Sequence, residues 1–86
     1  MTPQECKECA ISMNATYKYL HANRRIRWAY INDHKVPAEQ NCHTPEEHIL
    51  NEFQGIILDL LEHRRTPKKT EALLREYDYL FKQLTK

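Results

Sequence analysis

The chain has 86 residues, and 13 Lys and Arg against 12 Asp and Glu leave it a formal net charge of only +1. This length fits one small domain, and the near-neutral total argues against a generic nucleic-acid or membrane binder, although local patches can hide inside a balanced total. One glycine and one serine exclude a turn-rich β domain, which needs turn residues every few positions. We therefore expect an all-α fold.

Three Thr-Pro dipeptides mark the expected helix starts, at Thr2-Pro3, Thr44-Pro45 and Thr66-Pro67. In each, the threonine hydroxyl suits the N-cap and the proline has its φ preset for the first helical position. Glu5 and Glu47 follow at the capping-box spacing, whereas the third start has Lys69 there and is weaker. The dipeptide thus divides the chain into three helical segments.

The first segment predicts a helix over residues 3–33, because no glycine or proline interrupts it before Pro37. Its apolar residues form a roughly heptad stripe that includes the pair Cys6 and Cys9. Residues 34–43 have the composition of a loop. The sequence then predicts helices over 45–65 and 67–84, each with apolar residues at the i, i+3, i+4, i+7 spacing of one buried face.

The short turn between the last two helices predicts an antiparallel hairpin. Gly55 lies inside the second helix, where it is either a tolerated loss of helix propensity or the point at which another helix approaches closely. The expected architecture is a small three-helix bundle, a single domain over 1–86, in which a long or bent first helix packs against this hairpin.

The unequal helix lengths create a problem at the end of the first helix. At 1.5 Å per residue, a continuous helix over 3–33 is roughly 46 Å long, against roughly 31 Å and 27 Å for the other two. The overhang, near residues 24–33, contains apolar side chains that would be poorly solvated. Either the chain bends near Ala22-Asn23 and packs back, or a second copy covers the overhang in a homodimer.

The overhang is also the favoured partner-binding surface, because Trp, Tyr and Arg are the usual anchors of interfaces. We expect Trp28 to insert as the apolar anchor, unless it belongs to the core. The predicted partner-binding residues are Arg24, Ile26, Arg27, Trp28, Tyr30 and Ile31.

A second hypothesis is nucleic-acid binding by two basic groups, since arginine interleaved with aromatic residues provides phosphate contacts and stacking. The residues are Arg24, Arg25, Arg27, Arg64, Arg65, Lys68 and Lys69. A straight three-helix arrangement places the two groups at opposite ends of the bundle. It also places Glu46 and Glu47 near Arg24, where they would neutralise it.

A third hypothesis is a metal or thiol sensor. The candidate metal ligands are His34, Cys42, His43 and His48, although their spacing matches no standard zinc pattern. In an antiparallel bundle, Cys6 and Cys9 would lie tens of Å from Cys42, so a joint site is not expected. The Cys6–Cys9 pair has the C-x-x-C spacing of redox motifs, but without the strand that precedes them.

Catalysis is the class that the sequence favours least, since no acid–base pair lies on an apolar face and no glycine-rich phosphate loop is present. We expect no cofactor and no membrane span. Three cysteines, an odd count, are typical of a reducing compartment and therefore of the cytoplasm. The favoured function is a small interaction or regulatory module that acts through a helical surface.

Overall fold

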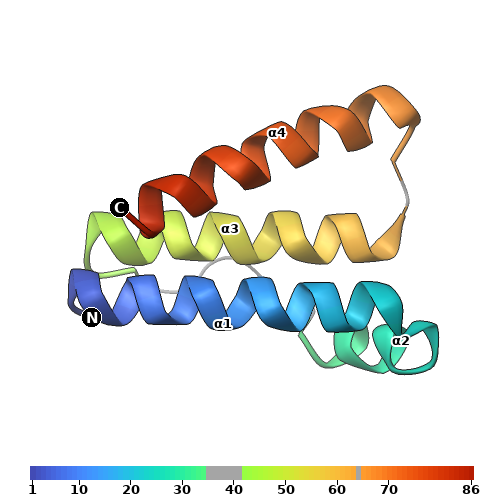
Figure 1. The fold of residues 1–86 in the computed structure, drawn as a ribbon, viewed down its shortest axis with the longest axis horizontal. Coiled ribbons are helices and arrows are strands. Elements are labelled where there is room, and N and C mark those ends of the chain that lie inside the picture. The colour runs from blue at the N-terminus through green and yellow to red at the C-terminus, as the bar shows by residue number, and fades with distance from the viewer. Residues whose placement is uncertain (35–41, 64) are drawn as a thin grey trace.

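The computed structural model describes residues 1–34, 42–63 and 65–86. Within these ranges the chain forms four helices and no strand: α1 Pro3–Ala22, α2 Arg24–Asp33, α3 Pro45–Glu62 and α4 Pro67–Leu84 (Figure 1). The predicted small all-α bundle is therefore confirmed, with four helices in the described residues where three were expected.

All three Thr-Pro pairs start helices. The Thr2, Thr44 and Thr66 hydroxyl oxygens each accept a hydrogen bond from the backbone N–H three residues later, at 3.2, 3.2 and 3.4 Å. Only the first capping box closes, because the Glu5 carboxylate accepts from the Thr2 backbone N–H at 3.3 Å. Glu47 instead accepts from the Met1 ammonium at 2.7 Å and from the His43 backbone N–H at 3.1 Å.

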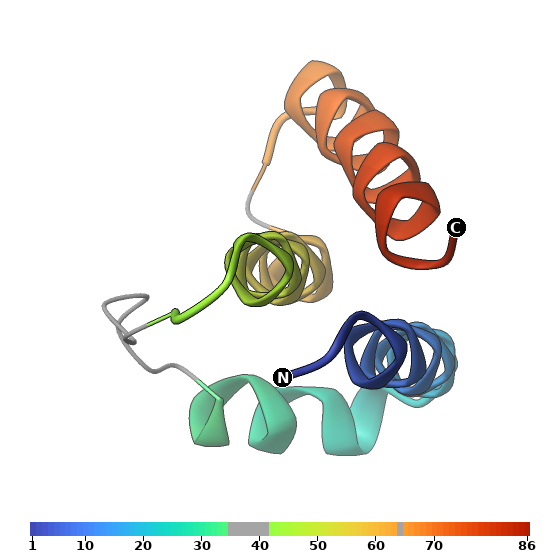
Figure 2. The same ribbon diagram turned by 90° about the vertical axis from the view of Figure 1, so that its left-hand side faces the viewer.

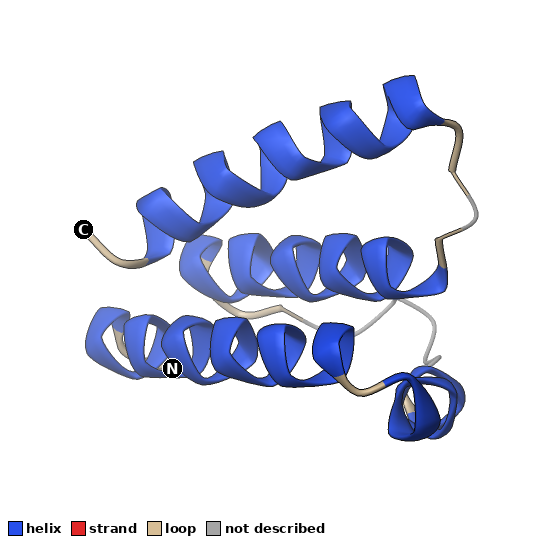
Figure 3. Cartoon of the chain, turned by 45° about the vertical axis from the view of Figure 1, so that its right-hand side comes forward, coloured by secondary structure: helices blue, strands red, loops and turns tan. Residues whose placement is uncertain are grey.

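The expected long helix is broken at Asn23, whose φ of −112° and ψ of 88° are not helical. Its N–H still donates to the carbonyls of Leu20 and Tyr19, so the C-terminal end of α1 is capped before the chain turns. α2 then runs across the end of the bundle, nearly perpendicular to α1 (Figures 2 and 3). Ile31 on α2 is fully buried. The chain therefore bends and packs back, which was the first of the two sequence-based alternatives.

Helix α3 stops three residues earlier than expected, at Glu62. His63 follows in the left-handed region, with φ 52° and ψ 33°, and its N–H bonds the Leu60 carbonyl at 3.4 Å. A residue in this conformation ends a helix, because it turns the chain away from the helix axis. α4 returns antiparallel to α3, as the hairpin prediction required (Figure 1).

The direction of α1 relative to α3 differs from the expected antiparallel arrangement: the two helices are parallel (Figure 1). The bond between the Met1 ammonium and Glu47 joins their N-terminal ends directly. A parallel arrangement requires the chain to return along the length of α3 before this helix begins. The ten residues after His34 can span up to roughly 35 Å, which is more than the ~27 Å length of α3, so the connection is long enough.

The core is apolar and centres on α3, which supplies half of the buried residues. Phe53 is fully buried and its ring contacts the rings of Tyr77 and Phe81, with centroids 5.0 and 5.8 Å apart. The Tyr77 hydroxyl donates to Asn14 Oδ1 and so ties α4 to α1. A Cβ at Gly55 would meet no atom within 4 Å, so the hypothesis of a close helix approach there is wrong.

Candidate anion-binding site at one end of the bundle

The two basic groups lie at the same end of the molecule, not at opposite ends as expected. α1 and α3 both finish at this end, α2 crosses it and α4 begins at it (Figure 1). We call this surface the basic end; its described residues are His21, Arg24, Arg25, Arg27, His63, Arg65, Lys68 and Lys69. Arg64, also predicted to bind nucleic acid, lies outside the described residues.

The acidic residues expected to neutralise Arg24 lie at the opposite end. Glu46 and Glu47 are in the first turn of α3, and Glu5 is in the first turn of the parallel helix α1. Acidic side chains are stabilised at helix N-termini by the helix dipole, as basic ones are at C-termini. Because α1 and α3 run the same way, the first-turn carboxylates of both helices lie at the same end of the molecule.

Two exposed histidines lie next to each other at the basic end. The rings of His21, in the last turn of α1, and His63, after α3, have centroids 5.8 Å apart. The Tyr17 ring stacks on His21 with the same centroid separation. The pKa of His63 is lowered, first by partial desolvation and then by the charges of Arg27, His21 and Arg24. The cations of α2 thus act directly on the end of α3.

Arg27 provides the link between α2 and this histidine pair. Its side chain is half-buried, and its Nε is a buried nitrogen without a hydrogen-bond partner among the described residues. Arg24 and Arg25, by contrast, are exposed. Of the three arginines of α2, Arg27 is therefore the one with a buried nitrogen, whereas Arg24 and Arg25 face solvent.

Two carboxylates of α3 lie near this surface. Asp59 pairs with Arg65 at 3.4 Å, with both side chains about 40% exposed, and Glu62 directly precedes His63. Lys68 and Lys69, in the first turn of α4, are exposed and lie where the helix dipole is positive. Beside Arg65 and Lys69 is a hollow of about 200 Å³, smaller than usual small-molecule pockets. The basic end is therefore an open surface with one small hollow.

The fold-back of α2 divides the predicted partner-binding residues. Ile31 is fully buried and Tyr30 is half-buried against His34, with ring centroids 3.9 Å apart. Trp28 keeps 48% of its surface exposed and Ile26 keeps 39%. Ile31 thus belongs to the core, Trp28 does not, and Trp28 and Ile26 lie on opposite flanks of α2, since two residues correspond to about 200° of helix.

The candidate metal ligands are dispersed. Nδ1 of His34 lies 2.9 Å from the Tyr30 carbonyl oxygen, and His48 faces Glu52 at 3.6 Å. Within residues 1–34, 42–63 and 65–86, no three His, Cys, Asp or Glu side chains are placed to hold one metal ion. The hypothesis of a metal site at His34, Cys42, His43 and His48 thus receives no geometric support there.

The three cysteines are unpaired thiols, and Cys6 is fully buried. Burial and then the carboxylates of Glu46 and Glu47 raise the pKa of the Cys6 thiol. The expected separation of Cys6 and Cys9 from Cys42 is wrong, because parallel α1 and α3 start at the same end (Figure 1).

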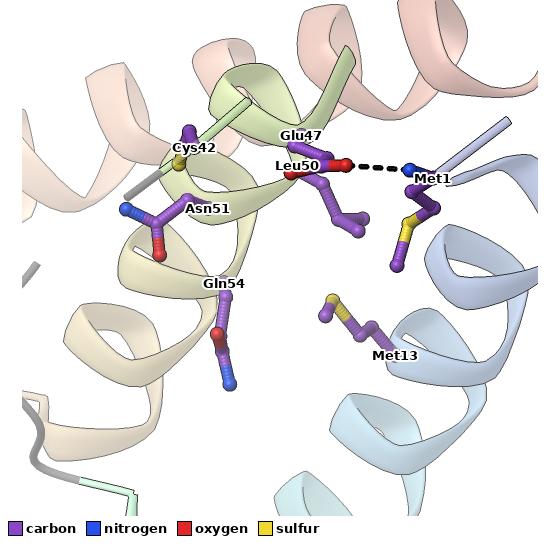
Figure 4. A pocket seen from close by; sticks show the side chains of 7 residues that line it. All are labelled: Met1, Met13, Cys42, Glu47, Leu50, Asn51 and Gln54. Carbon is purple, nitrogen blue, oxygen red and sulfur yellow. Dashed lines mark hydrogen bonds and ion pairs between the residues drawn. The ribbon is translucent and has the colours of Figure 1, made fainter. Parts of the chain in front are cut away.

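Cys42 lines a hollow of about 180 Å³ between the N-terminal ends of α1 and α3. Figure 4 shows Met1 and Met13 on one side of this hollow and Cys42, Asn51 and Gln54 on the other. The Glu47 carboxylate points across its rim to the Met1 ammonium. The hollow therefore combines soft sulfur atoms with an ion pair that holds the two helices together.

The described chain defines the class of protein as a small all-α helical bundle with a basic end. Comparison with protein families, curated proteins and solved structures finds no match. No described helix combines the length and the apolar character that crossing a membrane requires.

Proposed function

We propose that the protein binds single-stranded nucleic acid through the basic end. The observation that carries this proposal is that the two basic groups lie at one end of the bundle, on α2 and at the start of α4, with the ends of α1 and α3 between them, while the acidic residues at the starts of α1 and α3 lie at the other end. Clustered cations raise the local concentration of phosphates and orient an approaching polyanion, even when the net charge of the protein is near zero.

The exposure of Trp28 favours single-stranded over double-stranded nucleic acid as the ligand. It is the only tryptophan of the chain, is half-exposed, and lies three and four residues after Arg25 and Arg24, which is the spacing of neighbours on a helix surface. An exposed ring beside cations offers a platform for an unpaired base. In α4, by contrast, the apolar stripe faces the core, so this helix is not available for insertion into a major groove.

The test is fluorescence anisotropy of a labelled (dT)20 strand at several salt concentrations. Lys68→Gln/Lys69→Gln should weaken binding and reduce the slope of log K against log salt by about 1.4, at about 0.7 for each phosphate that the variant no longer neutralises. Lys82→Gln/Lys86→Gln is the matched control, because it removes the same charge near the other end of α4. Equal weakening in both variants, or no binding at low salt, would contradict the proposal.

Trp28 provides an independent arm of the same test. Trp28→Ala should weaken binding by about 1–3 kcal/mol, the usual value of one base–aromatic stack, while the far-ultraviolet circular dichroism stays that of the wild type. Quenching of the wild-type Trp28 fluorescence should accompany binding. If heparin binds as tightly as (dT)20 and Trp28→Ala changes neither affinity, the surface is a general polyanion site and the nucleic-acid proposal fails.

A second candidate function is protein–protein interaction, including self-association as a homodimer, through α2. The exposed Trp28 and Ile26 side chains favour it, since exposed aromatic residues next to arginine are common interface anchors. Sedimentation velocity over a concentration series tests it: the wild type should associate and Trp28→Ala should stay monomeric and folded. A wild type that is monomeric at every concentration argues against self-association.

For either function we propose a binding protein of the cytoplasm and not an enzyme. The unpaired thiols Cys6, Cys9 and Cys42 support a reducing compartment.

A further inference from the structure

One part of the basic end brings together two exposed histidines and the half-buried Arg27, which come from three helices or their ends. His21 comes from α1, Arg27 from α2 and His63 from the end of α3. The two imidazole centroids are 5.8 Å apart, and Tyr17 stacks on His21 from α1. The Tyr17 stack, together with the helix-terminal position of both histidines, restricts where these rings can lie.

Arg27 contributes an unsatisfied donor to the same place. Its Nε is buried and bonds none of the described residues, although buried N–H groups in proteins nearly always have an acceptor. The charge of Arg27 acts on His63, so the two side chains lie on the same part of the basic end. The oxygens of a phosphate match this set, because they accept several hydrogen bonds and carry negative charge.

Resting on the proposed function, we propose that His21, His63 and Arg27 form a subsite for one phosphate of the bound strand, and that a histidine takes up a proton when the phosphate binds. This subsite goes beyond general charge attraction, because it assigns one phosphate to three residues and predicts that pH controls the affinity.

The electrostatics of the basic end explain the proton uptake. Partial desolvation, and then the charges of Arg27, His21 and Arg24, oppose a positive charge on His63 and hold its pKa below the ordinary 6.5. A phosphate among these cations reverses the balance, since the imidazolium gains a charged acceptor. Glu62, the Arg65–Asp59 pair and the first-turn lysines of α4 also lie at this end. Affinity should therefore rise as the pH falls.

The backbone at His63 suggests the variant that removes the imidazole with least damage to the fold. Its positive φ is uncommon for a residue other than glycine, and asparagine adopts this region readily. His63→Asn therefore retains the end of α3. His21→Gln removes the second ring, and Arg27→Lys keeps the charge but removes Nε–H. His48→Gln is the control, because His48 pairs with Glu52 in α3 on the side of the acidic end.

The first experiment uses sulfate, an anion that does not titrate near neutral pH, and follows the five histidines and the arginine Nε–H groups by NMR. Sulfate should raise the pKa of His63 or His21 by at least half a unit and shift the Arg27 Nε–H signal, while His48 stays unchanged. If all five histidines respond alike, or none responds, the subsite is refuted whatever the macromolecular partner is.

The second experiment measures (dT)20 affinity between pH 5.5 and 8. The wild type and His48→Gln should bind up to about tenfold more tightly per unit fall in pH, the limit for uptake of one proton. His21→Gln/His63→Asn should lose this dependence, and Arg27→Lys should weaken binding at every pH. Binding of (dT)20 without these differences refutes the subsite but leaves the proposed function intact, whereas a sulfate response without (dT)20 binding refutes the proposed function alone.

Discussion

At the scale of single residues, Glu47 shows how a side chain with an expected local role acquires a long-range one. The sequence assigns it to a capping box with Thr44, but its carboxylate accepts from the Met1 ammonium, 46 residues away, and from the His43 backbone N–H. These two bonds hold the pKa of Glu47 below its ordinary 4.5, and the carboxylate raises the pKa of the Met1 ammonium above 8.0.

This pair predicts a bell-shaped contribution to stability. The Glu47 part is present above pH 4.5 and is lost as the pH falls through its lowered folded value; the Met1 part is present below pH 8.0 and is lost as the pH rises through its raised value. Glu47→Gln should therefore reduce the free energy of unfolding most between pH 4.5 and 8.0, as measured by urea denaturation. Glu8→Gln, an exposed control on α1, should show no such profile.

Gly55 gives a second prediction at this scale. It lies on the exposed side of α3, its φ is not positive, and open space surrounds its Cβ position. Gly55→Ala should stabilise the fold by about 0.5–1 kcal/mol, because alanine loses less backbone entropy in a helix. Chemical denaturation measures this gain, and a loss of stability would mean that α3 is approached on this face.

At the scale of elements, α2 depends most on tertiary contacts. It has ten residues, no side-chain cap at Asn23 and only one fully buried side chain, Ile31. Isolated helices of this length are marginal in water. Its position across the end of the bundle therefore rests on the contacts that Ile31 makes with the core.

Ile31→Ala should accordingly destabilise the protein by about 2–5 kcal/mol, the usual cost of such a truncation in a core. Ile26→Ala is the matched control, because it makes the same change in the same helix at a side chain that is 39% exposed. Hydrogen exchange should show the α2 amides losing protection in Ile31→Ala before those of α3. Equal costs for the two variants would contradict the described docking of α2.

At the scale of the whole molecule, the parallel pair α1 and α3 separates charge. Each helix carries acidic residues in its first turn, and basic residues follow where it ends. An antiparallel pair would mix the two at each end. The parallel pair, with α2 across one end, places Glu5, Glu46 and Glu47 at one end and the arginines of α2 at the other.

This separation should be visible in chromatography. We expect the protein to bind a cation exchanger near neutral pH more tightly than its net charge of +1 implies, because a patch binds a charged surface independently of the total. Lys68→Gln/Lys69→Gln should elute at lower salt than Lys82→Gln/Lys86→Gln, although both variants have the same net charge. Identical elution would show that the charge is not localised.

The sequence by itself determined the local structure. A threonine before a proline indicates where each helix begins, and the i, i+3, i+4 spacing of apolar residues indicates which faces of α3 and α4 are buried. Both patterns depend only on residues that are close in the sequence. The excess length of residues 3–33 also indicated a bend near Ala22-Asn23 as one of two alternatives. Two features were not predictable from the sequence, because each depends on distant parts of the chain. The capping box at 44–47 does not close, since Glu47 bonds Met1, and the Cβ position of Gly55 faces empty space, since no other described helix packs there.

Only the tertiary structure decided the direction of α3 relative to α1, and with it the candidate site. The periodicity of apolar residues along a helix is the same in either direction, so it does not indicate how α3 is oriented relative to α1. A ten-residue connection allows both the parallel and the antiparallel pairing. The sequence-based reasoning therefore identified the arginines and lysines of the basic end but not His21 or His63. It also placed the two basic groups at opposite ends and assigned Ile31 to a surface. The fold-back of α2 and the parallel pairing of α1 with α3 put these cations at the same end of the bundle, since burying Ile31 fixes where α2 lies.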